Sequence, residues 1–207
     1  SGPSDRDNDV FFPAIRPSLL AAGIAVASFD KRGVGGSDGS WLTAGIDAQA
    51  RDLLAAVTAV GEHLLSVPVG VFGHSQGGWV VQEALRRDAA SGRRLSFGIT
   101  SSGPGVSTAA QERFSAERTL ERTVGDPEER AGARRAAFTL IEMFERGATH
   151  TELLRWAADP QHAADAAIVR GMYGDDLPDA SLWSHFVDVA SFDPVPALTA
   201  VAVPLLA

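Results

Sequence analysis

The chain has 207 residues, of which 45% are apolar and 21% charged, and this composition suits a globular domain with or without an insertion. The net charge is −8 and the sequence has no basic block, which argues against a nucleic-acid partner. There is no cysteine, which excludes disulfides, thiolate catalysis and cysteine-type zinc sites, and no apolar run approaches the ~20 residues of a membrane span.

Short apolar runs and helical repeats alternate along the first half of the chain. Residues 10–22 have the pattern of a short helix broken near Pro13 and Pro17, and residues 24–29 are typical of a short strand. The same patterns predict a Gly-rich loop at 31–40, a helix at 46–64, a strand at 67–72, a helix at 79–87 and a strand at 95–100. This alternation predicts an α/β fold, with a mostly parallel sheet and flanking helices on both faces.

The second half has a different pattern. Residues 108–190 show helical repeats without a convincing strand, and residues 201–207 resemble the start of another buried strand. Breaks between helices are expected at 125–127, 147, 159–160 and 174–178. We therefore expect three parts: an α/β core at 1–107, a helical insertion at 108–190 and a return to the core at 191–207.

One sequence motif indicates a catalytic site. The segment Gly73-His74-Ser75-Gln76-Gly77 fits G-x-S-x-G, and it lies directly after a predicted strand and before a predicted helix. So sharp a turn forces its central serine into a strained conformation and projects the hydroxyl from the C-terminal edge of the sheet. The helix N-terminus favours negative charge, and the N–H of Gln76 is placed to donate to an oxyanion. The motif predicts Ser75 as a catalytic nucleophile; in the alternative, Ser75 only caps the helix.

Other chemistry-bearing residues have simpler interpretations. His74 is predicted to give structural support. Asp30 is predicted to order the Gly-rich loop that follows it, with a displaced triad acid as the alternative. Asp193 is interpreted as a turn or cap residue, and Trp79 as a core residue. The remaining histidines, which are His63, His150, His162 and His185, are expected at the surface or in the helical insertion. Trp156 and Trp183 lie in the predicted insertion, where they are expected either to pack in its core or to line an apolar acyl pocket.

Metal and phosphate sites are not supported. The acidic run at residues 5–9 has the spacing of a calcium loop, but Val10 replaces the required glycine and Arg16 the terminal glutamate. The Gly-rich run at 33–38 departs from the dinucleotide fingerprint, because Asp38 stands at its last place.

Four segments together resemble the α/β-hydrolase family, in particular its bacterial serine esterase and aminopeptidase-like branch. The motif around Ser75 is similar to the family's nucleophile elbow, and residues 30–37 match its D-x-R-G-x-G-x-S segment. Residues 1–7 resemble the end of its oxyanion loop, and residues 192–206 resemble the entry into the strand before the triad acid. The resemblance implies an α/β-hydrolase fold in which residues 108–190 form the cap or lid.

The resemblance also implies an activity. We expect a serine hydrolase that cleaves an ester-like acyl bond of a small-molecule substrate through an acyl-enzyme, with Ser75 as nucleophile, Gln76 and Ser1 as oxyanion donors, and no metal or organic cofactor. Peptidase, thioesterase or acyltransferase action on the same fold remains open, as does a non-catalytic hydrolase-fold binding protein or a purely structural role.

In the family, the triad acid follows the strand that begins here near Pro204, and the histidine follows one strand later. The resemblance therefore places both outside the sequence, and we expect the chain to be truncated at both ends rather than to be a degenerate protein. The residues of this chain contain no signal-peptide pattern, and the true N-terminus need not be among them. A cytoplasmic location is the expectation. The sequence does not predict an oligomeric state.

Overall fold

The computed structural model of the chain describes residues 11–62, 67–92 and 94–207. The chain divides into two compact units. The first comprises Ser1–Gly103 with Ala197–Ala207, and the second comprises Pro104–Pro196. Each unit is built around its own cluster of buried apolar side chains.

A small parallel sheet forms the centre of the first unit. Its strands lie in the order β1-β2-β3, and both pairs are parallel. The elements of this unit, with α9 at its edge, are α1 (Phe11–Ala21), η1 (Trp41–Thr43), α2 (Ile46–Gly61), β1 (Val69–His74), α3 (Gln76–Ser91), β2 (Leu95–Ser101), α9 (Val195–Ala200) and β3 (Leu205–Leu206). The parallel sheet with flanking helices confirms the predicted α/β class.

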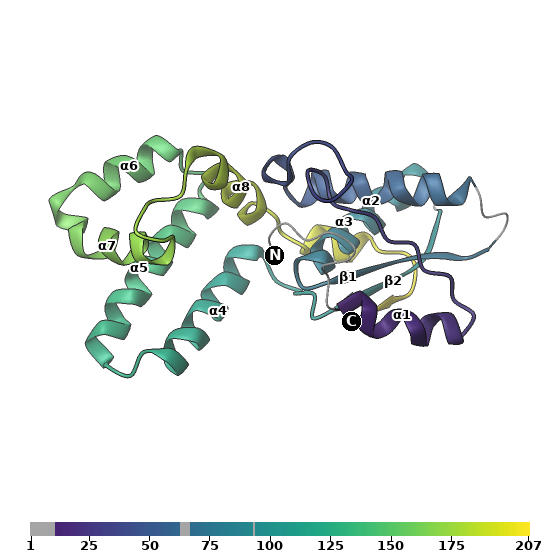
Figure 1. The fold of residues 1–207 in the computed structure, drawn as a ribbon, viewed down its shortest axis with the longest axis horizontal. Helices are drawn as coiled ribbons and strands as arrows, with labels where there is room; N and C mark the ends of the chain where they lie inside the picture. The colour runs from purple at the N-terminus through teal and green to yellow at the C-terminus, as the bar shows by residue number, and fades with distance from the viewer. Residues whose placement is uncertain (1–10, 63–66, 93) are drawn as a thin grey trace. The chain divides into compact units, whose positions relative to one another are not determined.

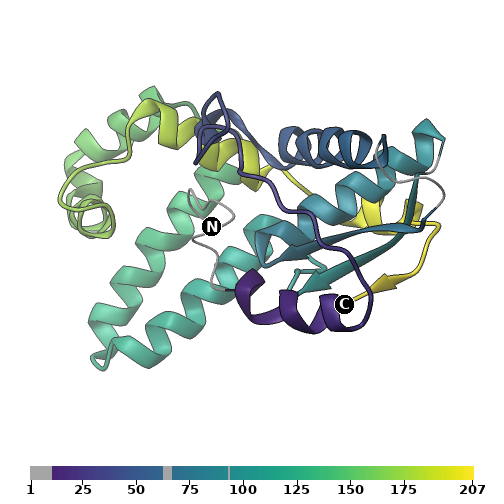
Figure 2. The ribbon, with the colours of Figure 1, turned by 45° about the vertical axis from the view of Figure 1, so that its right-hand side comes forward.

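Helices cover both faces of this sheet. Figure 1 and Figure 2 show α1 on one side of β1 and β2, with α2 and α3 on the other. On the α1 side, the ring of Phe12 meets that of Phe72 in β1 edge to face, with centroids 5.5 Å apart. On the other side, Val81 and Leu85 of α3 join buried residues of both long strands, and the apolar stripe of α2 packs against them.

Two local predictions are wrong. Residues 24–29 have no regular secondary structure and form no ladder with any strand that the structure describes. An apolar run forms a strand only where a partner offers backbone hydrogen bonds. The helix α1 is not broken at either proline. Pro13 lies in the first turn, where a backbone N–H would have no partner within the helix, and Pro17 lies inside α1, where it removes one backbone hydrogen bond.

The second unit is entirely helical. Its elements are α4 (Thr108–Thr123), α5 (Pro127–Glu145), α6 (His150–Ala158), η2 (Pro160–His162), α7 (Ala163–Met172) and α8 (Ala180–Ala190). The long helix α5 carries Leu140 and Met143 into the core, where they meet Leu153, Val169 and Trp183 from the other helices. All the predicted breaks fall between these helices.

Side-chain caps set where these helices begin. The carboxylate of Asp126 accepts from the first N–H groups of α5, and Asp179 does the same for α8. Thr149 and Glu152 form a reciprocal capping box at the start of α6. Because these caps are local sequence signals, the helix boundaries of this unit follow from the sequence. Across the described parts of both units, no helix has the length and apolar character that crossing a membrane requires.

Candidate active site

A single residue joins strand β1 to helix α3. Strand β1 ends at His74 and α3 begins at Gln76, so the whole change of direction falls on Ser75. Its backbone has φ 53° and ψ −121°, a region that non-glycine residues rarely adopt. The Ser75 side chain is exposed and makes no capping hydrogen bond to α3. The interpretation of Ser75 as a simple helix cap therefore lacks the contact that defines a cap.

Glycines on both sides make this turn possible; we call residues 73–78 the Ser75 turn. A Cβ atom on Gly73 would lie 2.0 Å from the carbonyl oxygen of Gly77, and one on Gly78 would lie 2.4 Å from the Cα of Gly103. A Cβ on Gly77 would meet nothing within 4 Å. The motif thus needs its first glycine for close packing, and the second close approach falls at Gly78, one residue after the motif.

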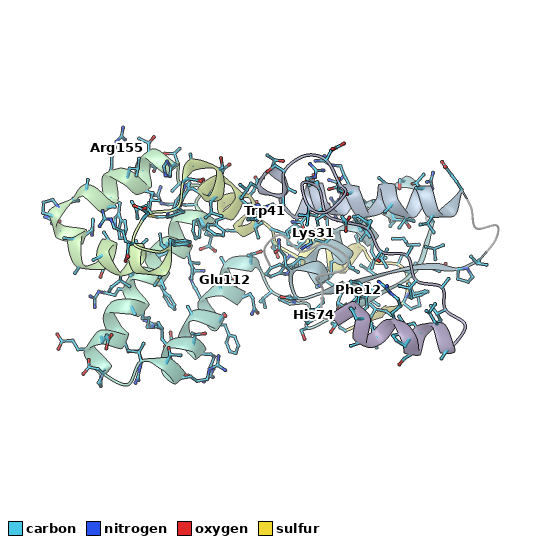
Figure 3. The ribbon with its side chains drawn as sticks, in the orientation of Figure 1. Phe12, Lys31, Trp41, His74, Glu112 and Arg155 are labelled. Atoms are coloured by element: carbon cyan, nitrogen blue, oxygen red, sulfur yellow. The ribbon has the colours of Figure 1, made fainter. Side chains whose placement is uncertain are left out.

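The end of β2 holds the Ser75 turn in place. The N–H of Ser75 donates to the carbonyl oxygen of Ser101 at 2.9 Å, and the N–H of Gly78 donates to the carbonyl oxygen of Ser75 at 2.8 Å. The ring of His74, at the end of β1 in Figure 3, lies with Nδ1 3.3 Å from the hydroxyl oxygen of Ser101. His74 thus contacts the neighbouring strand, which agrees with its predicted supporting role.

The start of α3 provides the electrostatic setting. Gln76 is the first residue of this helix, and the N–H groups of a first turn have no carbonyl partner within the helix itself. The helix dipole adds a partial positive charge at the same end, and α3 has no acidic side chain in its first turn to neutralise it. This arrangement favours negative charge developing next to Ser75.

Asp30 orders the Gly-rich loop, as the sequence predicts. Its buried carboxylate accepts from the N–H of Gly36 at 3.0 Å, and its carbonyl oxygen accepts from the hydroxyl of Ser37 at 2.8 Å. Arg32 extends from the loop to α2, where its guanidinium makes a bidentate contact with Asp52 at 2.5 and 2.7 Å. These contacts raise the pKa of Arg32, chiefly through the hydrogen bonds that its guanidinium donates to Asp52. The loop is therefore fixed by hydrogen bonds within itself and to α2.

The other predicted residues fall in three places. Ser1 and His63 lie outside the described residues. Asp193 accepts from the N–H of Val195 at 3.0 Å and so acts as a cap. The histidines of the second unit take structural positions, with His150 bonded to the carbonyl oxygen of Pro178, His162 stacked on Trp156 and His185 buried in α8. Within the described ranges, no group of three or more acidic or histidine side chains is suited to hold a metal ion.

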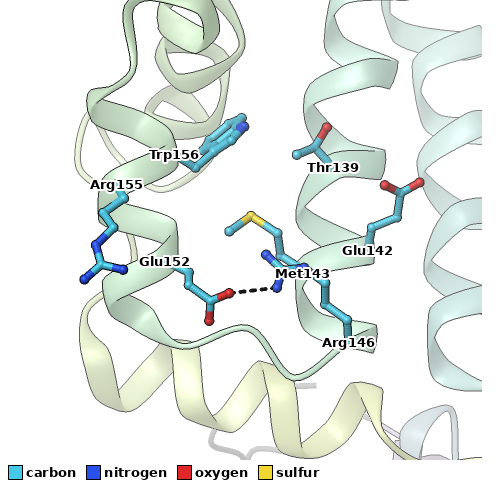
Figure 4. Close-up of a pocket in the computed structure, with 7 residues that line it drawn as sticks. All are labelled: Thr139, Glu142, Met143, Arg146, Glu152, Arg155 and Trp156. Carbon is cyan, nitrogen blue, oxygen red and sulfur yellow. Dashed lines mark hydrogen bonds and ion pairs between the residues drawn. The ribbon is translucent and has the colours of Figure 1, made fainter.

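The tryptophans behave mostly as core residues. Trp79 is 3% exposed, which confirms its predicted position. Trp183 is buried in the second unit, where its indole N–H donates to the carbonyl oxygen of Ala148 at 2.7 Å. Trp156 instead lines a hollow of about 370 Å³ in the second unit. Figure 4 shows this hollow between α5 and α6, with an ion pair of 2.8 Å from Arg146 to Glu152 beside it.

Sequence reasoning missed the importance of the end of β2. Ser101 is the last residue of the strand, and Ser102 and Gly103 follow it; Ser101 and Gly103 contact the Ser75 turn directly. Ser102 itself has φ 53°, the same value as Ser75. The only signal in the sequence is the Ser-Ser-Gly-Pro run after an apolar segment, which indicates a turn but not its partner.

One comparison with known proteins shows the family. The sequence model of the family Hydrolase_4, described as serine aminopeptidase, S33, matches residues 11–132, which is more than half of the chain. A search of curated proteins finds no match.

Two solved structures are similar to the chain. Rv0554 from Mycobacterium tuberculosis is 19% identical, with a TM-score of 0.46 over 91% of this chain and 62% of that one. An AqdC variant in complex with its substrate, from work on ring cleavage of the Pseudomonas quinolone signal, is 20% identical, with a TM-score of 0.45 over 95% of this chain and 64% of that one. The chain thus spans less than two thirds of the length of either structure. On its sequence match and its parallel α/β sheet, the chain belongs to the serine aminopeptidase S33 family of α/β-hydrolases.

Proposed function

We propose that the protein is a serine hydrolase that cleaves an ester-like acyl bond, with Ser75 as its nucleophile. The observation that carries this proposal is the state of Ser75: strained, exposed, and without the helix-capping bond that would otherwise explain a serine there. Strained residues persist where the surrounding structure fixes them, and they gather at active sites. Membership of a hydrolase family supports the same assignment.

The proposed reaction has two acyl-transfer steps. The Ser75 hydroxyl oxygen bonds to the carbonyl carbon, and its proton passes to a histidine base. The bond from carbonyl carbon to the leaving alcohol then breaks, and the alcohol takes the proton. Water repeats the attack on the acyl-enzyme and releases the acid. The N–H of Gln76 donates to the oxyanion in both steps, and such a donor contributes about 3 kcal/mol to transition-state stabilisation.

The other catalytic groups lie elsewhere. His74 contacts Ser101, so we do not propose it as the base. By the family resemblance, the proposed base is a histidine outside the described residues. The same holds for the triad acid that the family resemblance implies. Ser1, the proposed second oxyanion donor, lies outside the described residues as well.

We further propose that the helical residues 108–190 act as the cap that selects substrates. The support is their separate apolar core and the absence of any strand throughout these fully described residues. A cap that folds on its own core can vary in sequence without disturbing the sheet that holds Ser75.

Peptidase action on an N-terminal amino acid is the second candidate, because the matched family is described as serine aminopeptidase. It needs the same nucleophile and oxyanion donors, and it differs only in the bond that is cleaved. Comparing a p-nitrophenyl alkanoate with an aminoacyl p-nitroanilide separates the two, since only a peptidase turns over the anilide efficiently.

A fluorophosphonate probe tests the nucleophile in the intact protein. We expect one labelled serine, mapped to Ser75 by peptide mass spectrometry, and loss of both labelling and ester turnover in Ser75→Ala. Ser115→Ala is the matched control, because Ser115 is exposed on α4 in the other unit, and it is expected to label like the natural protein. Full labelling of folded Ser75→Ala would exclude Ser75, and a folded protein that never labels would favour the non-catalytic binding protein.

A further inference from the structure

Three described residues other than glycine have a positive φ: Ser75, Ser102 and Asp175. Asp175 has a local explanation, because it follows Gly174 after α7 and its N–H closes the helix end on the carbonyl oxygen of Arg170 at 2.9 Å. Aspartate also tolerates this region better than most residues. Neither explanation applies to the two serines, which lie at strand ends.

Ser102 lies beside Ser75 at the same edge of the sheet. In the parallel register His74 pairs with Ser101, so the next step brings Ser75 next to Ser102. Neighbouring strands in a sheet are roughly 4.8 Å apart. The residues on either side of Ser102 are both fixed to the Ser75 turn, Ser101 by its carbonyl oxygen and Gly103 by its contact with Gly78. Ser102 therefore lies between two residues that both contact the Ser75 turn.

The side chain of Ser102 is not used by the fold. It is exposed, and among the described residues its hydroxyl has no hydrogen-bond partner. A glycine would take the same backbone conformation without strain. Ser102 thus has a strained backbone and a side chain that makes no hydrogen bond within the described part of the fold, and it lies next to the proposed nucleophile. This combination indicates that its hydroxyl contacts the substrate.

We propose that Ser102 is a specificity residue whose hydroxyl bonds to a polar atom of the acyl group near the cleaved carbonyl. The preferred substrates are then acyl groups with an oxygen or nitrogen close to the carbonyl, rather than plain alkyl chains. This inference rests on the proposed function, since it takes Ser75 as the nucleophile that the acyl group must reach.

Two nearly isosteric esters test this, p-nitrophenyl methoxyacetate and p-nitrophenyl butyrate, which differ by an ether oxygen in place of a methylene. The readout is the ratio of their kcat/KM values in the intact protein, so the different intrinsic reactivity of the esters cancels between variants. We expect the ratio to fall about tenfold in Ser102→Ala and Ser102→Gly, as expected for one lost hydrogen bond. Ser102→Gly should also unfold at a higher temperature, because it relieves the strained backbone.

The outcomes separate the two proposals. A stabilised Ser102→Gly with a lowered ratio supports the inference, because a purely structural role would not change selectivity. An unchanged ratio in both variants, with hydrolysis still dependent on Ser75, overturns the role of Ser102 alone. If the intact protein shows no hydrolysis that Ser75→Ala removes, the proposed function fails and this inference fails with it.

Discussion

The backbone N–H of Ser75 donates to the carbonyl oxygen of Ser101 at 2.9 Å, so the proposed nucleophile is held by the strand next to its own. This bond continues the parallel ladder one residue beyond the end of β1. The position of Ser75 thus depends on the sheet as well as on its own turn. Changes at the end of β2 should therefore affect the site even where they leave the G-x-S-x-G motif intact.

The close packing of the Ser75 turn predicts different effects for its two motif glycines. Gly73→Ala places a methyl group 2.0 Å from the carbonyl oxygen of Gly77, which is backbone and can move only by distorting the turn. We expect a loss of about 2–3 kcal/mol in the free energy of unfolding, together with loss of ester turnover. Urea titration followed by far-UV circular dichroism measures the first effect.

Gly77→Ala is the matched control, because its methyl group would meet nothing within 4 Å and it lies in the first turn of α3. We expect a change in unfolding free energy of less than about 1 kcal/mol, since alanine favours the helix. Equal destabilisation by both substitutions would contradict the packing described for this turn.

Asp88 near the end of α3 predicts a stability effect away from the site. Its buried carboxylate accepts from the N–H of Arg94, just before β2, at 3.0 Å, and from the N–H of Leu95, the first residue of β2, at 2.9 Å. Asp88→Ala leaves these donors without an acceptor, and we expect a loss of about 2–3 kcal/mol in the free energy of unfolding. Asp188→Ala, an exposed aspartate on α8, should change it by less than about 0.5 kcal/mol. Similar values for the two variants would argue against this role of Asp88.

Much of this fold follows from local signals in the sequence. The helices of the second unit begin directly after capping residues such as Asp126 and Thr149, whose side chains bond to the next few N–H groups, and such bonds need no distant partner. The turn at Ser75 is predictable for the same reason, because strand, glycines and helix are contiguous in the chain. The parallel pairing of β1 and β2 follows from the helix between them.

The remaining features depend on residues far apart in the sequence. The approach of Gly78 to Gly103 and the strain at Ser102 arise only when β1 and β2 pair, and no local pattern marks either. Residues 24–29 fail as a strand for a related reason, since a strand is defined by its partner. The family resemblance supplied the remaining expectations, including that for Ser1, which lies outside the described residues.

Glu152 predicts a pH dependence for the second unit. The guanidinium of Arg146, followed by the N–H and hydroxyl of Thr149, lowers the pKa of Glu152 from 4.5 to about 2. Because the folded pKa lies below the unfolded one, the stabilisation is complete above pH 4.5 and is lost as the pH falls toward about 2. The carboxylate is exposed, so salt should weaken the effect.

The test of this linkage compares the natural protein with Glu152→Gln, which cannot ionise. We expect the difference in thermal midpoint between them to be constant above about pH 5 and to shrink steadily at lower pH. A difference that is independent of pH would show that the carboxylate charge contributes nothing to the capping box.

The buried hydrogen bond from Trp183 to Ala148 is expected to contribute to the stability of the second unit. The Trp183 side chain is 2% exposed, and its indole N–H is the donor that satisfies the carbonyl oxygen of Ala148, which is also buried. Trp183→Phe keeps an aromatic ring against Phe144 but removes this donor and leaves unfilled volume. We expect the free energy of unfolding to fall by about 2–4 kcal/mol.

Trp156→Phe is the control, because Trp156 is only half-buried beside the hollow of Figure 4, and it should lower the free energy of unfolding by less than half as much. If both substitutions cost the same, ring volume alone sets the stability of this core, and the hydrogen bond to Ala148 adds nothing to it.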